Sequence, residues 1–267
     1  MKEHGDRGFD SSLMNRDLEG KVAIVTGASS GIGKATAMLF SNKGARIALV
    51  GRNKTPLEQL RDTLPGEAVA IAADVTVDGD CERIVLDTIA KFGRLDILVN
   101  AAGIIANGTL ENTTLQEWDA MFKINVRSVF YLMHLAISHL IETKGNVVNV
   151  SSVNGQRAFP NVLAYCSSKA ALDHLTRCAA LEMASKGVRV NAVCPGVTRT
   201  QLHRRGGMDE ATYQKFLEHS KETHPLGRVG NPEEIAELVL FLASPRASWI
   251  TGVTYLIDGG RGQTCFR

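Results

Sequence analysis

Residues 21–33 constrain the fold of this chain more than any other segment. Residues 21–26 (Lys-Val-Ala-Ile-Val-Thr) form a short β-branched apolar run, which is typical of a buried parallel strand. A glycine-rich segment, residues 27–33, follows directly, and residues 34–43 place apolar side chains at the spacing of an amphipathic helix. Strand, glycine loop and helix N-terminus in this order predict a cradle for the pyrophosphate of a dinucleotide.

Three glycines of this loop have separate expected tasks. Gly27 permits the tight turn, Gly31 lets the backbone approach the phosphates, and Gly33 allows the helix to pack closely on the strand. Their GxxxGxG spacing differs from the general GxGxxG fingerprint, so the loop fits that fingerprint only loosely.

Tyr165 and Lys169 lie four residues apart, and Ser152 precedes the tyrosine by 13 residues. Four residues are just over one helical turn, so the phenol and the ammonium would project from the same helix face. Because an ammonium favours the phenolate, we expect it to lower the pKa of Tyr165 from an ordinary value of about 10. Such a phenol can exchange a proton with an alcohol oxygen, which predicts general acid–base chemistry.

Five motifs in the same order resemble those of the short-chain dehydrogenase/reductase family, over about residues 18–260. Residues 26–33 are similar to its TGxxxGIG signature, residues 100–103 to its NAG-type motif and residues 195–196 to its Pro-Gly motif. The family's catalytic tetrad is matched by Asn125, Ser152, Tyr165 and Lys169. The resemblance implies an oxidoreductase that transfers hydride between a nicotinamide cofactor and a carbonyl or secondary alcohol.

Strand and helix patterns alternate along the rest of the chain. Beyond the first strand, the expected strands are residues 46–50, 68–72, 96–99, 146–151, 188–193 and 253–257. The further expected helices are residues 56–64, 77–92, 115–142, 163–186 and 232–243. The alternation predicts an α/β fold, and the resemblance specifies a single-domain, Rossmann-type, doubly wound parallel sheet of seven strands with helices on both faces.

We expect one folded domain over residues 20–267, because neither internal repeats nor a Pro/Ser-rich linker divide it. Residues 1–19 are polar and lack the apolar core of a signal peptide, so we interpret them as a flexible tail. Residues 195–230 are the least regular stretch and follow a strand. A long excursion at that place predicts a substrate lid.

The resemblance assigns a role to each member of the tetrad. Tyr165 is the general acid or base, and Lys169 both lowers its pKa and hydrogen-bonds the nicotinamide ribose. Ser152 holds the substrate oxygen, and Asn125 anchors a water that relays protons to Lys169. Without the glycine loop, Tyr165 would instead be interpreted as a helix-surface aromatic and Ser152 as a strand-end hydroxyl.

Cofactor contacts are also implied by the resemblance. Asp74 would bind the adenine amino group, and residues 195–198 would meet the nicotinamide carboxamide. Residues 100–103 would let the cofactor pass close to the backbone, and Asn100 would stabilise the central sheet. Turn or cap roles are the alternatives for these segments. The expected cofactor-binding residues are Gly27, Ser29, Ser30, Gly31, Ile32, Gly33, Arg52, Asn53, Asp74, Val75, Asn100, Ala101, Ala102, Gly103, Tyr165, Lys169, Pro195, Gly196, Val197 and Thr198.

The end of the second expected strand favours NADP(H) over NAD(H). Gly51 stands where NAD-dependent members of the family carry an aspartate that binds the ribose 2′-hydroxyl, and Arg52 follows. A guanidinium matches a 2′-phosphate well, and Ser30 could add a hydroxyl contact. The alternative is that Arg52 is a solvated surface charge.

Ser152, Asn154, Phe159, Gln201 and Leu202 are the expected substrate-binding residues. Their apolar members favour an apolar carbonyl compound, and hence a carbonyl reductase. A 3-oxoacyl-(acyl-carrier-protein) reductase is the second possibility, although lysines at 144 and 186 stand where those enzymes tend to carry arginines. A hydroxysteroid dehydrogenase stays open. A non-catalytic NADP(H)-binding redox sensor is disfavoured because the tetrad is intact.

Composition limits the partners of the chain. Its 267 residues carry a net charge of +2 without a basic block, which argues against nucleic acid. The 44% hydrophobic content suffices for a core, and no continuous apolar run predicts a membrane span. Five cysteines and seven histidines lack metal-site spacing, so we expect no metal and a reducing, cytoplasmic location. The long apolar helices, with the family resemblance, imply a homotetramer or a dimer.

Overall fold

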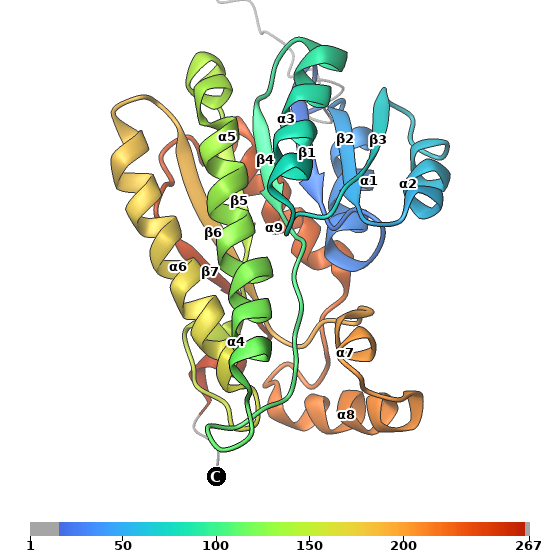
Figure 1. Cartoon of the computed structure of the whole chain (residues 1–267), viewed down its shortest axis with the longest axis vertical. Helices are drawn as coiled ribbons and strands as arrows, with labels where there is room; N and C mark the ends of the chain where they lie inside the picture. Colours follow the sequence, from blue (N-terminus) through green and yellow to red (C-terminus); the bar gives the residue numbers. More distant parts are fainter. Residues whose placement is uncertain (1–15, 265–267) are drawn as a thin grey trace, which may run out of the picture.

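Seven parallel strands form one sheet in the order β3-β2-β1-β4-β5-β6-β7 (Figure 1) in the computed structural model, which describes residues 16–264. The order reverses between β1 and β4, where the chain crosses from one half of the sheet to the other. In such sheets, ligands bind at the carboxyl ends of the strands beside this reversal. The strands are β1 (Val22–Thr26), β2 (Arg46–Gly51), β3 (Ala68–Ala72), β4 (Ile97–Asn100), β5 (Asn146–Val150), β6 (Arg189–Pro195) and β7 (Thr254–Ile257).

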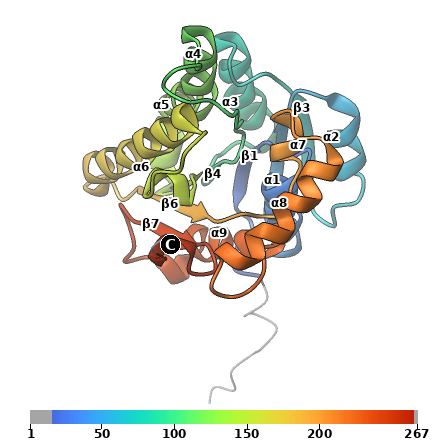
Figure 2. The ribbon, with the colours of Figure 1, turned by 90° about the horizontal axis from the view of Figure 1, so that it is seen from below.

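Helices cover both faces of the sheet (Figures 1 and 2). One face packs against α3 (Asp78–Phe92), α5 (Ser128–Thr143) and α6 (Leu163–Ala184). The opposite face packs against α1 (Gly31–Asn42), α2 (Lys54–Arg61) and α9 (Pro232–Ala243). The expected doubly wound α/β sheet with seven parallel strands is confirmed.

Alternation along β1 shows how the two layers form. Val22 and Ile24 belong to the core beneath α3, α5 and α6, whereas Ala23 and Val25 belong to the core beneath α1, α2 and α9. Because successive side chains of a strand point to opposite faces, an apolar strand supplies both cores at once. This double burial explains why the strand sequence is apolar without interruption.

The helical run from residue 115 to residue 143 differs from the single regular helix that we expected. It consists of α4 (Leu115–Phe122), a π-helical turn (Lys123–Arg127) and α5. Thr114 caps α4 in a capping box with Glu117, whose backbone amide donates to the Thr114 hydroxyl over 3.2 Å. The π turn carries Asn125, and such turns are frequent at functional sites.

By length and composition, the helical run Leu115–Thr143 would also suffice for a membrane span. Its α5 segment places Val129, Leu132 and Ala136 in the core against the sheet. Packing of this kind accounts for the apolar character of the helix as part of a protein layer. Among the described residues, no other helix meets the same criterion.

The turn before β1 packs against the rest of the domain. Residues 1–15 of the predicted tail lie outside the described residues, but Leu18 is only 1% exposed and packs in the core beside α1. Its amide donates to the Lys43 carbonyl over 3.1 Å, so the turn before β1 is part of the fold. One apolar residue in a polar segment gives only a weak sequence signal of this packing.

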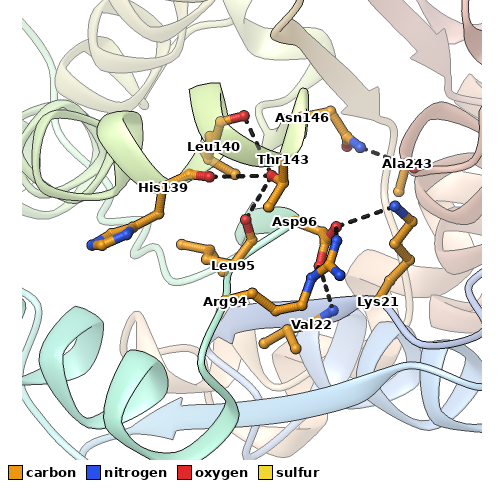
Figure 3. A network of polar contacts seen from close by, with 10 residues as sticks. All are labelled: Lys21, Val22, Arg94, Leu95, Asp96, His139, Leu140, Thr143, Asn146 and Ala243. Atoms are coloured by element: carbon orange, nitrogen blue, oxygen red, sulfur yellow. Dashed lines mark hydrogen bonds and ion pairs between the residues drawn. The ribbon is translucent and has the colours of Figure 1, made fainter.

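A buried carboxylate joins the amino ends of β1 and β4 (Figure 3). Asp96, 2% exposed, accepts hydrogen bonds from the Val22 amide (3.0 Å), from Lys21 Nζ (3.1 Å) and from Arg94 Nε and Nη2 (2.8 and 2.7 Å). Burial raises the pKa of Asp96, but these donors outweigh burial and the pKa lies below its usual range. The carboxylate is thus held in its charged form.

Replacing Asp96 with alanine should lower the free energy of unfolding by about 3 kcal/mol at neutral pH, because Lys21 and Arg94 lose their counter-charge. Urea denaturation measures this loss. Since the folded pKa is depressed, the contribution is present above the unfolded pKa of about 3.9 and disappears as pH falls through the folded pKa. Asp62→Ala, which removes an exposed partner of Arg61, is the control and should change stability by less than about 1 kcal/mol. Equal losses in the two variants would contradict the prediction.

Candidate active site

The glycine loop packs directly against the backbone that follows β4. A Cβ atom on Gly27 would lie 2.9 Å from the Ala101 carbonyl oxygen, and one on Gly33 would lie 2.5 Å from the Gly27 carbonyl oxygen. Gly27 and Gly31 have φ of 67° and 55°, in the left-handed region that favours glycine. Side chains are therefore excluded from this crevice, as a closely approaching dinucleotide backbone requires.

Hydrogen bonds from Thr26 fix the second wall of this crevice. The Thr26 hydroxyl at the end of β1 accepts from the amides of Ala101 (3.0 Å) and Ala102 (3.1 Å). Ser30 precedes α1, and its side chain makes no capping hydrogen bond to the first amides of that helix. A helix N-terminus in this state is suited to an anionic phosphate.

A cavity of about 890 Å³ extends from the glycine loop to the lid. Most of the expected site residues line it, and they come from every strand end between β1 and β6. The expected residues on its wall are Gly27, Ser29, Ser30, Gly31, Ile32, Gly33, Arg52, Asp74, Val75, Ala101, Ala102, Gly103, Ser152, Asn154, Phe159, Tyr165, Lys169, Pro195, Gly196, Val197, Thr198, Gln201 and Leu202.

Tyr165, Lys169 and Ser152 meet on one wall of this cavity. Tyr165 and Lys169 lie one turn apart at the start of α6 and are 6% and 5% exposed, and Ser152 follows β5. Lys169 Nζ lies 5.8 Å from the centre of the Tyr165 ring and donates to the Val150 carbonyl over 2.8 Å. Ser152 and Tyr165 share a hydrogen bond.

Burial controls the ionisation of this pair. It raises the pKa of Tyr165 to about 12, and the Ser152 hydrogen bond lowers that pKa only in part. Burial likewise lowers the pKa of Lys169 to about 8, although the charge of Asp173 opposes the change. The expected net lowering of the Tyr165 pKa is wrong in this structure, because the phenolate loses hydration on burial and Ser152 offsets that loss only in part. The phenol is protonated at neutral pH.

Asn125 supports the cavity from behind its wall. Its side-chain oxygen accepts from the Ile104 amide (3.0 Å), and its Nδ2 donates to the Ile104 carbonyl (3.1 Å) and to Ser168 Oγ (3.1 Å). A Cβ on Gly103 would lie 3.2 Å from Asn125 Oδ1 and 3.7 Å from Lys169 Nζ. The amide and the ammonium therefore flank the same glycine.

Two of the expected cofactor-binding residues do not line the cavity. Asn100 is 2% exposed and donates within the sheet to Asn149 Oδ1 over 2.9 Å, so its contribution is to the junction of β4 and β5. Asn53 is exposed and precedes α2, beyond the cavity rim. Strand-end motifs predicted the position of the crevice but not which side chains of each segment turn away from it.

At the other end of the cavity, Arg52 is exposed on the rim. Asp74 Oδ1 accepts from the Thr76 amide (2.9 Å) and hydroxyl (2.8 Å). Asp74 thus has the turn role that we considered as the alternative, while it also lines the cavity.

Residues 195–230, the expected substrate lid, carry two helices, α7 (Leu202–Arg205) and α8 (Glu210–Thr223), which lie together below the sheet (Figures 1 and 2). Its ends are joined by a bridge between Thr198 and Gly230. Met208 and Phe216 in the lid line the cavity, as does Arg261 after β7. We did not anticipate these three; apolar spacing in α8 could have indicated Phe216, whereas no local motif marks Arg261, whose guanidinium lies 4.7 Å above the Phe159 ring.

No group of three or more histidine, cysteine, aspartate or glutamate side chains that could hold a metal ion occurs within residues 16–264. A phenol, an ammonium and a hydroxyl, those of Tyr165, Lys169 and Ser152, line the cavity. Together with a hydride donor, these groups can protonate or deprotonate a substrate oxygen.

Known proteins with similar sequences and folds are oxidoreductases. Residues 27–261 match the family described as enoyl-(acyl carrier protein) reductase. A 3-oxoacyl-[acyl-carrier-protein] reductase from Thermotoga maritima is 39% identical over 247 residues, which cover 91% of this chain and 98% of that protein.

Two solved structures have the same fold as this chain over nearly its whole length. A short-chain dehydrogenase/reductase of unknown function from Caenorhabditis elegans, crystallised with cofactor, is 34% identical with a TM-score of 0.88 and covers 93% of this chain and 97% of that one. A 3-ketoacyl-(acyl-carrier-protein) reductase from Brucella melitensis, complexed with NADH, is 35% identical with a TM-score of 0.84. The match covers 92% of this chain and 99% of that one. The chain therefore belongs to the short-chain dehydrogenase/reductase family and is an oxidoreductase acting on CH–OH and C=O groups.

Proposed function

We propose that this protein is an NADPH-dependent carbonyl reductase whose general acid is Tyr165. The observation that carries the proposal is the meeting of Tyr165, Lys169 and Ser152 on the wall of the cavity that the glycine loop also lines. A nicotinamide cofactor would supply hydride when bound. The glycine loop and the N-terminus of α1 fit its pyrophosphate because side chains are excluded there.

The residues of the chain then act on the substrate oxygen. Ser152 Oγ holds this oxygen by a hydrogen bond, and Tyr165 donates its proton to it as the carbonyl becomes an alcohol. Because the pKa of Tyr165 is about 12, the phenol enters the reaction protonated. The phenolate left behind is stabilised by the Lys169 ammonium one helical turn away. Asn125 and Lys169 flank Gly103, which supports a proton relay between them.

The proposed preference for NADPH over NADH depends on residues at the rim of the cavity, where β2 ends. Gly51 leaves no carboxylate to repel a 2′-phosphate, and Arg52 on the rim can pair with that phosphate. The relative from Brucella melitensis was solved with NADH. Arg52 is therefore the residue on which the proposed NADPH preference depends.

A 3-oxoacyl-(acyl-carrier-protein) reductase is the second candidate function, favoured by the 39% identity to the Thermotoga maritima enzyme. An acidic carrier protein would need a basic surface near the cavity entrance. Comparing turnover of a 3-oxoacyl carrier thioester with turnover of free ketones distinguishes the two functions. Rapid turnover of the thioester alone would replace the first proposal with the second.

We also propose that the chain forms a homotetramer or dimer through its long helices. Phe130 of α5 and Leu181 of α6 are 52% and 82% exposed, and Tyr255 of β7, at the edge of the sheet, is 41% exposed. Exposed large apolar side chains on adjacent elements are typical of contacts between subunits.

Replacing Tyr165 with phenylalanine should reduce kcat for NADPH-driven ketone reduction by about 10²–10⁴-fold, because the proton donor is lost. The dissociation constant of NADPH, measured by fluorescence titration, should change little. Tyr131→Phe removes an exposed hydroxyl that bonds Glu82 and serves as the matched control with unchanged kcat. Full activity of the Tyr165 variant would contradict the assignment.

Replacing Arg52 with alanine should raise KM for NADPH by roughly tenfold or more, because a charge-assisted contact to the 2′-phosphate is lost. KM for NADH should stay nearly constant, since NADH has no such phosphate. Lys54→Ala, a nearby exposed cation that does not line the cavity, is the control. Equal changes of KM for the two cofactors would argue against the role of Arg52.

The rate of carbonyl reduction should fall as pH rises above about 8. Reduction requires protonated Tyr165, whose pKa is about 12, and charged Lys169, whose pKa is about 8, so Lys169 loses its proton first. The measurement is kcat/KM from pH 6 to pH 10, with samples returned to pH 7 to confirm that the enzyme is still folded. A constant kcat/KM up to pH 10 would show that Lys169 does not limit the reaction.

A further inference from the structure

Asp173 is a buried carboxylate that the reaction described above does not use. It follows Lys169 by four residues on α6, so Tyr165, Lys169 and Asp173 form a ladder along one helix face. The three side chains are 6%, 5% and 1% exposed. Three titratable groups at successive turns of a buried helix face are unusual, because each charged form loses its hydration.

The surroundings of Asp173 exclude water and supply few charges. Cys194 Sγ of β6 lies 3.8 and 4.0 Å from the two carboxylate oxygens, and the Ser151 hydroxyl also hydrogen-bonds to the carboxylate. The pKa of Cys194 is raised to about 12 by burial, so this neighbour is a neutral thiol. On α6 itself, the charged neighbours are Lys169 and the exposed Arg177.

The turn after β5 closes over the carboxylate. A Cβ atom on Gly155 would lie 2.6 Å from Asp173 Oδ2 and 2.9 Å from the Lys169 carbonyl oxygen. Only a residue without a side chain lets this turn pack so closely on α6. In the part of the chain that the structure describes, no arginine or lysine lies within ion-pair distance of Asp173.

We propose that Asp173 is a positioning residue that keeps Lys169 in its ammonium form at the wall of the cavity. This inference rests on the proposed function of Lys169. In a poorly hydrated interior, a carboxylate one helical turn away acts on an ammonium without a direct contact, because little solvent screens it. Burial raises the pKa of Asp173, and the charges of Arg177 and Lys169 oppose this rise. In its ionised form, Asp173 compensates for part of the cost of burying the Lys169 charge.

Loss of the Asp173 charge should change the pKa of Lys169 in one direction only. Without the Asp173 charge, Lys169 would lose its proton at a lower pH. Reduction of a carbonyl compound would then decline at a lower pH as well, because the developing Tyr165 phenolate loses its counter-charge. A residue that only packs the interior would lower stability or kcat at every pH and would leave the pH of the decline unchanged.

The experiment compares the wild-type chain with Asp173→Asn, which removes the charge and retains the shape. The Lys169 pKa is measured by NMR titration of protein with labelled lysine, assigned with Lys169→Met, and kcat/KM for ketone reduction is measured over the same pH range. In Asp173→Asn we expect the Lys169 pKa and the alkaline decline to fall by about one pH unit, which makes kcat/KM at pH 8 several-fold lower than in the wild type, with little change at pH 6. Asp96→Asn, a buried aspartate at the opposite ends of the strands, is the control that should leave the pH of the decline in place.

A second variant, Cys194→Ala, covers the case in which Asp173→Asn does not fold. Removing the thiol donor weakens the ionised form of Asp173, so the Lys169 pKa should fall in the same direction by a smaller amount. An unchanged Lys169 pKa in the folded variants would overturn the inference, even if the wild type reduces ketones rapidly. If the wild type reduces no carbonyl compound, the proposed function fails, and the NMR comparison still decides whether Asp173 controls the charge of Lys169.

Discussion

Close contact between two backbone turns at the carboxyl edge of the sheet is the constraint on which the cavity depends. Thr26 at the end of β1 holds the amides after β4, and Gly27 approaches Ala101 so closely that a Cβ atom would collide. This contact places the crevice where the strand order reverses. Every other part of the site is arranged around that crevice, from Arg52 at one end to the lid at the other.

The second determinant of the site is the loss of hydration on α6. Sequence spacing places an ammonium beside a phenol, which in water would favour the phenolate. In the folded chain both groups are buried, so the pKa of Tyr165 rises and that of Lys169 falls. The phenol is buried and neutral, and the lysine beside it is only marginally charged. A nearby negative charge has a large effect on the ionisation of such a lysine, because little solvent screens it. Asp173, on the same helix, provides such a charge in its ionised form.

Much of the fold was predictable because its signals are local. Apolar runs predicted all seven strands within one or two residues, and the alternation with helices predicted the parallel sheet. The π turn at Asn125 was not predictable, since apolar spacing over residues 115–142 does not distinguish a regular helix from one with an inserted residue. Asn100 bonds within the sheet, as we expected of it, and neither Asn100 nor Asn53 lines the cavity, because a motif marks a segment whereas backbone orientation decides which side chains face the cavity.

The sequence by itself determined the order of strands and helices, the glycine loop and the identity of the reactive groups, because each depends on residue type and short-range spacing. Only the tertiary structure decided the ionisation of those groups and the composition of the cavity wall. Arg261 and Phe216 reach the cavity from segments far along the chain. The burial that shifts Tyr165 and Lys169 arises from layers of the protein that meet only after folding, and no local pattern encodes the hydration that is lost there.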